Sequence, residues 1–260
     1  MRAAWRDLWQ HRTVLWMLMV RDVKVQYRHA VLGLAWAVLK PGLLMVILTV
    51  VFSHFARFPS EGFPYSIWVL AALVPWTFFA AALTTGASSL VAHPNLVTKI
   101  RFPREILPLA ANGSAVLDLG IGMVLLGGLM AFYRVPITIH ALYAVPLLLI
   151  LILWTAAASL LLAAVNVFYR DVRVVTPLLI QVLLFASPVL YPLSVVPERW
   201  KALYALNPMV GIIDGLRRAL LAGQSPDPLS FGTALAASCG LAVLAYAYFK
   251  RVEPEFADVV

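Results

Sequence analysis

Long apolar runs, separated by short polar or charged segments, dominate this chain. Six of the runs reach about 20 mostly apolar residues, the length that an α-helix needs to cross the hydrocarbon core of a bilayer. The predicted spans are residues 32–55, 65–88, 106–132, 141–165, 174–193 and 230–249. The pattern therefore predicts an all-α integral membrane protein with six transmembrane helices, in which residues 1–260 form a single domain.

The segment before the first span, residues 5–28, has the periodicity of an amphipathic helix. At about 100° per residue, apolar and aromatic side chains gather on one side, and arginine, lysine and glutamine gather on the other. Such a helix lies in the headgroup plane of the membrane, either as a plain lipid anchor or as an anchor that also contacts a cytoplasmic partner. The apolar side holds Trp5, Leu8, Trp9, Trp16, Met19, Val20, Val23 and Tyr27, and the polar side holds Arg6, Gln10, Arg21, Lys24 and Arg28.

A short cationic segment, residues 95–105, connects the second and third predicted spans. Asn95 is placed to cap a short helix that runs through Lys99, and Pro103 ends it. A helix of this kind has only lipid headgroups or another protein to pack against. A solvated loop is the alternative interpretation.

The loop between the fifth and sixth spans is unusually apolar for a segment outside the membrane. Two short helices are predicted within residues 197–221, and Asn207-Pro208 breaks the chain between them. In the second helix, Asp214 is spaced to meet Arg217 or Arg218 one turn later. Each helix is too short to span a bilayer. We therefore expect the pair to dip into the outer leaflet or to cover the mouth of a pore.

Composition strengthens the membrane assignment, since 62% of the residues are hydrophobic and only 12% are charged. A soluble enzyme, a disordered chain and a nucleic-acid-binding domain are all excluded by this balance. The net charge of +8 follows from lysine and arginine in cytoplasmic segments. Thirteen basic residues fall on the side of both termini and six on the other side, which predicts a multi-pass protein of the cytoplasmic membrane with both termini in the cytoplasm.

Motifs for catalysis and for nucleotide binding are missing from the sequence. None of the five lysines follows a glycine, so there is no phosphate-binding loop ending in Gly-Lys, and neither HExxH nor GxSxG occurs. The five histidines are scattered without a pair at metal-ligand spacing. We therefore expect no catalytic residue, no metal site and no cofactor in this chain.

Two charged residues lie inside predicted spans. Lys40 sits near the start of the first span, where its long side chain can reach the headgroups, and Asp118 lies nearer the middle of the third. Asp118 is expected to face either a neighbouring helix or a cargo path. The aromatic candidates for lining a path are Trp36, Trp76, Phe79, Phe185 and Tyr191, although packing in the core or at the membrane interface is the commoner role for such residues.

Four local strings, taken in order, point to a known family. They are VLGLAWAVLKP at 31–41, NLVTKIRFPREILP at 95–108, NVFYRDVR at 166–173 and SPVLYPLSVVPERWKALYALNPM at 187–209. Together with an interfacial N-terminal helix and two short helices before the last span, they resemble the type-2 ABC exporter membrane subunits that move lipid-linked polysaccharides. The resemblance covers nearly the whole chain.

The resemblance implies a homodimeric pore with one ATP-binding cassette subunit beneath each half, so that ATP and magnesium bind to the partner. It also implies a polyisoprenyl-diphosphate-linked glycan as cargo, such as O-antigen or a related teichoic or capsular polymer, with Arg28 and Lys40 as candidates to meet the diphosphate. The implied ATPase-coupling residues are Asn95, Lys99, Arg101, Phe102, Arg104, Glu105, Arg170, Asp171 and Arg173. The implied outer-gate residues are Glu198, Trp200, Tyr204, Asn207, Pro208, Asp214 and Arg217.

Two other functions remain open from the residues alone. A membrane-embedded transferase or flippase-like enzyme could act on the same lipid carriers, although no acid, base or metal site of the usual kind is present. A passive channel is the third possibility. An obligate ATPase partner separates the exporter from both.

Overall fold

The computed structural model describes residues 9–28, 33, 35–55, 59–100 and 102–259, and within these ranges the chain is helical, without a strand. Five helices in the described part are long and apolar enough to cross a membrane. They are α3 (Ala35–Thr49, continued by the π-helical turn Val50–Phe55), α4 (Tyr65–Ala92), α6 (Ile106–Phe132), α7 (Ala144–Phe168, preceded by the 3-10 turn Ile139–Tyr143) and α11 (Pro228–Val252).

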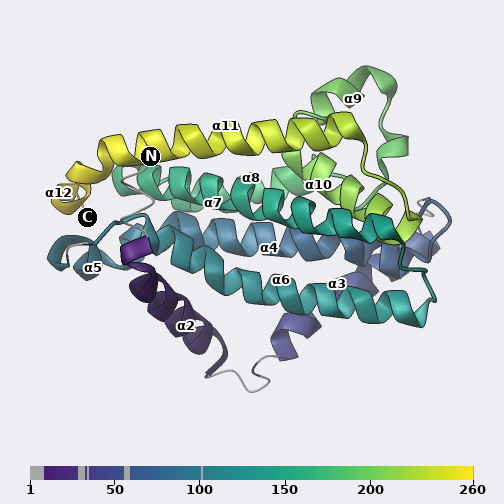
Figure 1. Ribbon diagram of the computed structural model, residues 1–260, viewed down its shortest axis with the longest axis horizontal. Helices are drawn as coiled ribbons and strands as arrows, with labels where there is room; N and C mark the ends of the chain where they lie inside the picture. The colour runs from purple at the N-terminus through teal and green to yellow at the C-terminus, as the bar shows by residue number, and fades with distance from the viewer. Residues whose placement is uncertain (1–8, 29–32, 34, 56–58, 101, 260) are drawn as a thin grey trace.

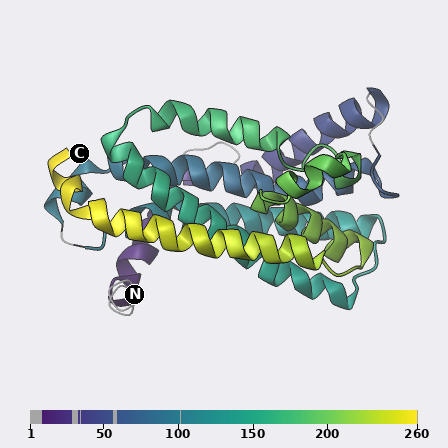
Figure 2. The ribbon, with the colours of Figure 1, turned by 90° about the horizontal axis from the view of Figure 1, so that it is seen from above.

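Shorter helices complete the fold at both ends of the bundle. They are α2 (Arg12–Arg28), α5 (Pro94–Lys99), α8 (Val172–Phe185), α9 (Glu198–Tyr204), α10 (Pro208–Arg217, continued by the π-helical turn Arg218–Ala222) and α12 (Phe256–Val259). In Figures 1 and 2, α5 and α12 lie at one end of the bundle, and α9 lies at the other. The cationic loop between α4 and α6 and the C-terminal helix therefore share one face of the protein.

Helix α4 is the central element, and almost all of its middle is buried. It packs against α6 and α7, and α11 packs against α7 on the far side. Small residues allow close contact between these helices, as is common for helices in lipid. At Gly86 an added Cβ would lie 2.6 Å from Cβ of Ser159, whose hydroxyl donates to Oδ1 of Asn112 at 3.1 Å. This buried polar contact ties α4, α6 and α7 together.

The predicted fifth span, 174–193, is wrong as a single helix, because α8 ends at Phe185. Residues 186–192 continue without helical structure. The cause is local: Pro188 has no backbone N–H to donate and disfavours the helical conformation of the residue before it. A chain segment that leaves the helix must satisfy its backbone polar groups in another way.

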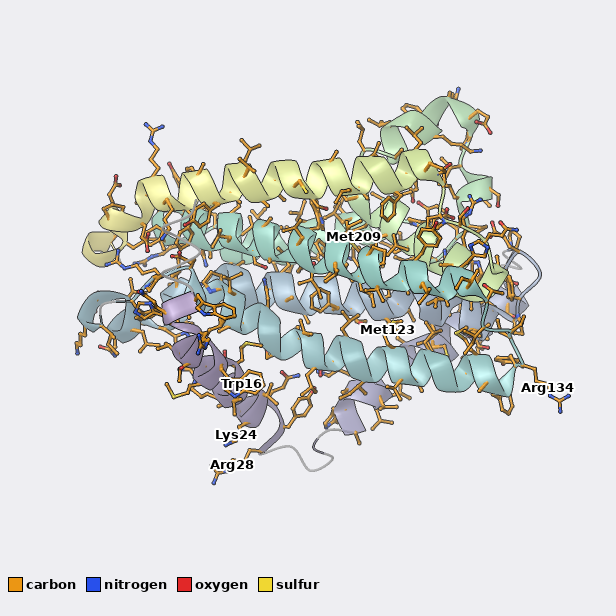
Figure 3. All side chains as sticks on the ribbon, viewed as in Figure 1. Trp16, Lys24, Arg28, Met123, Arg134 and Met209 are labelled. Atoms are coloured by element: carbon orange, nitrogen blue, oxygen red, sulfur yellow. The ribbon has the colours of Figure 1, made fainter. Side chains whose placement is uncertain are left out.

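A helix is present where the amphipathic one was predicted, and α2 packs on the bundle with residues of both predicted sides, since Met19 and Arg21 face other helices. Met19 lies against Gly113 of α6, where a Cβ on the glycine would meet Cε of Met19 at 2.2 Å. Trp16 is 65% exposed, and Lys24 and Arg28 project away from the bundle (Figure 3). Trp5, Arg6 and Leu8 lie outside the described residues.

Candidate functional site

A cleft of about 730 Å³ separates α2 from the rest of the bundle. Its walls come from α2, α3, α4 and α6, and α2 crosses the bundle obliquely beside it (Figure 1). Most of the lining is apolar, but polar and charged side chains come from all four helices. These are Arg21, Asp22, Gln26, Lys40, Thr85, Ser88, Ser89, His93, Ser114 and Asp118.

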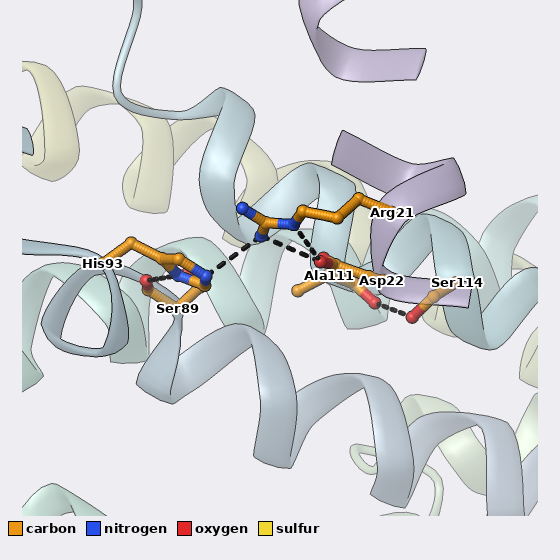
Figure 4. Close-up of polar contacts among 6 residues, drawn as sticks. All are labelled: Arg21, Asp22, Ser89, His93, Ala111 and Ser114. Carbon is orange, nitrogen blue, oxygen red and sulfur yellow. Dashed lines mark hydrogen bonds and ion pairs between the residues drawn. The ribbon is translucent and has the colours of Figure 1, made fainter. Parts of the chain in front are cut away.

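One wall of the cleft is fixed by a contact between α2 and the end of α4 (Figure 4). Nη2 of Arg21 lies 2.9 Å from Nε2 of His93, and Nδ1 of His93 lies 3.0 Å from the carbonyl oxygen of Ser89. A carbonyl can only accept, so Nδ1 donates to it and Nε2 accepts from the guanidinium, which requires a neutral imidazole. Asp22 Oδ1 accepts from Nε and Nη2 of Arg21 at 3.0 and 2.8 Å, which keeps the guanidinium at the cleft.

Asp118 forms a second contact between α2 and α6. Its carboxylate accepts a hydrogen bond from the hydroxyl of Tyr27 and another from Nε2 of Gln26, the latter at 3.0 Å. The intramembrane carboxylate is therefore bonded to a neighbouring helix and at the same time lines the cleft. The bonds to Gln26 and Tyr27 agree with the expectation that Asp118 faces a neighbouring helix, and contact with cargo stays a prediction.

Replacing Asp118 with asparagine is expected to loosen α2. The amide offers one acceptor oxygen and places an NH₂ group where the carboxylate accepts from two donors, so about 1–2 kcal/mol of docking free energy should be lost. Tryptic cleavage after Arg21 and Lys24 in the purified protein should then accelerate several-fold, and export should slow while assembly is retained. Asp171→Asn, at an exposed carboxylate that does not contact α2, is the control for the cleavage rate. Unchanged cleavage would show that Asp118 does not hold α2.

The other predicted cargo-path residues are spread over the protein. Lys40 lines the cleft, whereas Arg28 lines a neighbouring groove of about 500 Å³ formed along α2. Trp36 on α3 and Phe185 on α8 are exposed outside the cleft. Trp76 and Phe79 are buried in the core of α4, with ring centroids 5.5 Å apart, so neither lines the cleft. Tyr191 lies at the other end of the bundle, in the segment after α8.

The predicted coupling residues fall into two groups. The first group is exposed: Asn95 and Lys99 on α5, Arg170 and Asp171 in the turn between α7 and α8, and Arg173 in the first turn of α8. Phe102 is partly buried against the apolar cluster beneath α5. Arg101 lies outside the described residues. Asn95 is not the helix cap, because α5 begins at Pro94 with His93 in the capping position, a start that proline at the first helical residue could have indicated.

Arg104 and Glu105 turn inward toward the end of α11. The Arg104 backbone N–H donates to Oε1 of Glu253 at 3.1 Å, and Nη1 of Arg104 donates to the Glu253 carbonyl. Glu105 is only 1% exposed, and its Oε2 accepts from Nζ of Lys250 at 2.8 Å. Both side chains therefore bond to another part of the same chain, the C-terminal end of α11. The pairing joins residues about 150 positions apart, so no local sequence signal could have shown it.

Side chains hold the carbonyls at the end of α8 and in the non-helical segment after it, and of these side chains only Tyr191 belongs to the segment itself. Phe185 O accepts from the Tyr191 hydroxyl, Ala186 O from Nδ2 of Asn207, and Leu190 O from the Tyr65 hydroxyl, at 2.5, 2.9 and 2.9 Å. Ser187 O accepts from the Val189 backbone N–H at 2.7 Å. These bonds satisfy a backbone that has left its helix near the membrane.

Arg217 supplies the two remaining bonds to this segment from a buried position on α10. Nη1 donates to Pro188 O at 2.5 Å and Nη2 to Val189 O at 3.0 Å, while Nε donates to Trp68 O of α4 at 3.1 Å. The guanidinium lies 3.2 Å from the centroid of the Trp68 ring, and the residue is 5% exposed. Burial lowers the pKa of Arg217 to about 9, opposed by the charge of Asp214, so the side chain remains protonated at neutral pH.

Arg217 thus differs from the outer-gate residue that was expected. The carboxylate of Asp214 lies close enough for its charge to act on Arg217, as the spacing predicted. All three nitrogens of the Arg217 guanidinium, however, donate to backbone carbonyls. For the other predicted outer-gate residues the structure gives positions and bonds, and their gate role stays a prediction. Glu198 and Trp200 are exposed on α9, Tyr204 bonds to Tyr191 at 2.7 Å between hydroxyls, and Asn207 caps α10 through Met209 N, directly before the buried Pro208.

Comparison with known proteins gives the family. A sequence profile described as ABC-2 type transporter matches residues 13–221. The O-antigen export system permease protein RfbA of Myxococcus xanthus is 32% identical over 259 residues, 98% of either chain, and RfbA of Klebsiella pneumoniae is 24% identical over 245 residues, 92% of either chain. The polysialic acid transport protein KpsM of Escherichia coli is 22% identical over 218 residues, 82% of this chain and 83% of its own. The family that the sequence strings indicated is confirmed, and the chain belongs to the ABC-2 type transporters as a transmembrane subunit without an ATPase domain.

Proposed function

We propose that this chain is the membrane subunit of an ATP-driven exporter that moves a lipid-linked polysaccharide, O-antigen or a related glycan, across the cytoplasmic membrane. The observation that carries this proposal is the similarity to the O-antigen export permease RfbA over 98% of both chains. A full-length match without large insertions favours a shared architecture and a shared class of cargo. The ATP-binding subunits would be separate chains, since this one has no nucleotide-binding loop.

The chain would cross the membrane six times, with both termini in the cytoplasm. Five crossings correspond to the long helices, and α8 would provide the remaining one. Its 14 residues span roughly 21 Å, less than the hydrocarbon core. The segment 186–192 would complete the crossing, since side chains from α4, α10 and the preceding loop satisfy its carbonyls. The excess of basic residues at the end that carries α5 supports a cytoplasmic location for that end.

The ATP-binding subunits would dock against α5 and against the turn between α7 and α8. Exposed charges gather there, with Lys99 at the end of α5 and Arg170, Asp171 and Arg173 at the turn. We leave Arg104 and Glu105 out of this proposed contact, because their side chains bond to the C-terminal end of α11. ATP-driven closure of the partner subunits would push on these elements and tilt the spans.

The cleft beside α2 would receive the diphosphate end of the cargo. Arg21 and Lys40 supply positive charge on two of its walls, and arginine and lysine are the usual partners of phosphate oxygens. The apolar remainder of the lining suits an isoprenoid chain. Arg28, in the neighbouring groove, would attract the same diphosphate through its positive charge.

A second copy of the chain would complete the path. Helices α3 and α8 each leave a row of large apolar side chains exposed, and lipid alone or a second copy can cover them. The rows are Val38, Leu43, Leu44, Val46 and Ile47 on α3, and Val174, Val175, Leu178, Leu179 and Val182 on α8. A homodimer with two ATP-binding subunits is the assembly that we propose.

Reconstitution tests this function. The chain, purified with the ATP-binding cassette protein encoded beside it, should move a polyisoprenyl-diphosphate-linked glycan into proteoliposomes only when ATP is supplied. A partner with its phosphate-loop lysine replaced is the matched inactive control. Charge reversal at Lys99 and Arg170 together should reduce co-purification of the partner by about tenfold. Transport without nucleotide would overturn the proposal, and modification of the lipid-linked sugar by the chain alone would favour a membrane enzyme.

A further inference from the structure

The loop that leads from α5 into α6 is joined to the C-terminal end of α11 by four charged residues. Lys250 lies at the centre of the cluster: its Nζ donates to Glu105 Oε2 at 2.8 Å and to Glu253 Oε2 at 2.9 Å. Glu253 in turn accepts at Oε1 from the Arg104 backbone N–H and at its carbonyl from the Arg104 side chain. The loop and the helix end are thus bonded through two consecutive residues of the loop.

The buried carboxylate of Glu105 depends on its hydrogen bond from Lys250 more than a solvent-exposed carboxylate would. It occupies the position that precedes α6, where an acidic side chain commonly caps the helix, but it makes no capping bond. Its carboxylate is buried, and within the described part of the chain Oε1 has no hydrogen-bond partner. Lys250 therefore provides the whole compensation for a buried charge, and its loss would leave that charge unpaired.

An apolar contact reinforces the ionic one. Helix α12 follows α11 after the 3-10 turn Glu253–Glu255 and packs against α5, with which it shares one end of the bundle in Figure 1. Phe256 at its start is fully buried, edge-on to Phe249 of α11 at 5.2 Å between centroids and 6.0 Å from Phe168 of α7. Val97, the one buried residue of α5, belongs to the same cluster. The underside of α5 therefore rests on the C-terminal segment.

Helix α5 has six residues, which is too short to be rigid without support, because helices of this length are unstable on their own. Its support comes from the contacts just described, which connect it to α11, α7 and α12. A force applied to α5 must then reach α11 directly, in addition to the neighbouring α4 and α6. The strength of that connection depends on Lys250 and Phe256.

We infer that Lys250, Glu253 and Phe256 form a clamp that fixes the α5 loop to the last long helix, and that Lys250 and Glu105 are positioning residues through which ATP-driven movement of α5 is transmitted to α11. The transmission part rests on the proposed function, whereas the clamp itself does not. Removing the clamp should leave ATP hydrolysis by the partner intact and reduce the glycan exported for each ATP consumed.

The experiment compares Lys250→Gln and Lys250→Arg, with Arg251→Gln as the matched control at an exposed neighbouring cation. Backbone amide exchange of residues 95–100 in the purified complex should become about tenfold faster in Lys250→Gln, because a segment that has lost its support opens more often. The control should be unchanged, and Lys250→Arg should restore protection. Glycan exported per ATP should fall about tenfold in Lys250→Gln and recover in Lys250→Arg.

A second variant, Phe256→Ala, tests the same inference if Lys250→Gln folds poorly. Phe256→Ala removes the apolar half of the clamp close to the chain end and should also speed amide exchange in α5. Unchanged exchange in both variants overturns the clamp. Faster exchange with an unchanged amount of glycan per ATP overturns the transmission role alone. If the wild-type complex shows no ATP-driven export, the proposed function fails, and amide exchange still decides the clamp.

Discussion

Replacing Arg217 with methionine should abolish export and sharply lower the yield of folded protein. Methionine fills a similar volume but donates nothing, so the carbonyls of Pro188 and Val189 would lose their donor in a buried region, and the carbonyl of Trp68, which lies within helix α4, would lose a second donor. Each unsatisfied carbonyl costs about 1–3 kcal/mol, so the total is a large part of a typical protein's stability. The loss of the cation on the Trp68 ring adds to this effect.

Arg217→Lys should recover part of the stability, because one ammonium keeps the charge but cannot reach three carbonyls in different directions. Arg218→Met is the matched control, since Arg218 is the next residue and, within the described part of the chain, its side chain donates no hydrogen bond to the segment after α8. Thermal unfolding in detergent and O-chain display in a permease-deletion strain are the measurements. Wild-type unfolding temperature in Arg217→Met would show that the segment is held by other contacts.

The long helices were predictable because hydropathy alone determines them. A run of about 20 apolar residues has few alternatives to a spanning helix, and the predicted ranges for α4, α6 and α11 lie within a few residues of the observed ones. The prediction of one continuous fifth helix was wrong for a specific reason. The apolar run continues through Ser187 and Pro188, so hydropathy alone extended the predicted helix beyond the residues where proline disfavours helical structure.

The polar contacts were not predictable, because they join distant parts of the sequence. Arg21 meets His93 across 72 positions and Lys250 meets Glu105 across 145. Periodicity placed Arg21 on the polar side of a helix, facing lipid headgroups. The family resemblance implied that Glu105 lies in a segment that contacts the ATP-binding partner. Asp118 was the exception, because a carboxylate in an apolar run signals that a partner or a polar cavity must be nearby.

Arg217 shows the limit of local spacing most clearly. Asp214 stands three residues before it, so the sequence favours an ion pair on the helix surface. In the folded chain the helix is buried, and the guanidinium serves backbone carbonyls that exist only because α8 ends early. The two features explain each other, since an interrupted helix near the membrane requires donors from elsewhere. Neither could be inferred without knowing that α10 packs between α4 and the segment after α8.

Gly211→Ala should displace α10 and inactivate the protein, although it adds a single methyl group. A Cβ at residue 211 would lie 2.3 Å from the carbonyl oxygen of Ser230 and 3.2 Å from Cβ of Ala234, so it would collide with the backbone of α11. Backbone cannot rotate away as a side chain can. We expect a loss of about 1–3 kcal/mol or more from overpacking, visible as a lower unfolding temperature in detergent.

Gly232→Ala, on the first turns of α11, is the control for that substitution. A Cβ there meets nothing within 4 Å, and alanine has a higher helix propensity than glycine, so stability should stay level or rise by up to about 1 kcal/mol. The damage at Gly211 should also spread, because Arg217 lies less than two turns further along the same helix. A shift of α10 that withdraws Arg217 from Pro188 and Val189 would give Gly211→Ala the export defect of Arg217→Met. An unfolding temperature equal to that of Gly232→Ala would refute the close contact between α10 and α11.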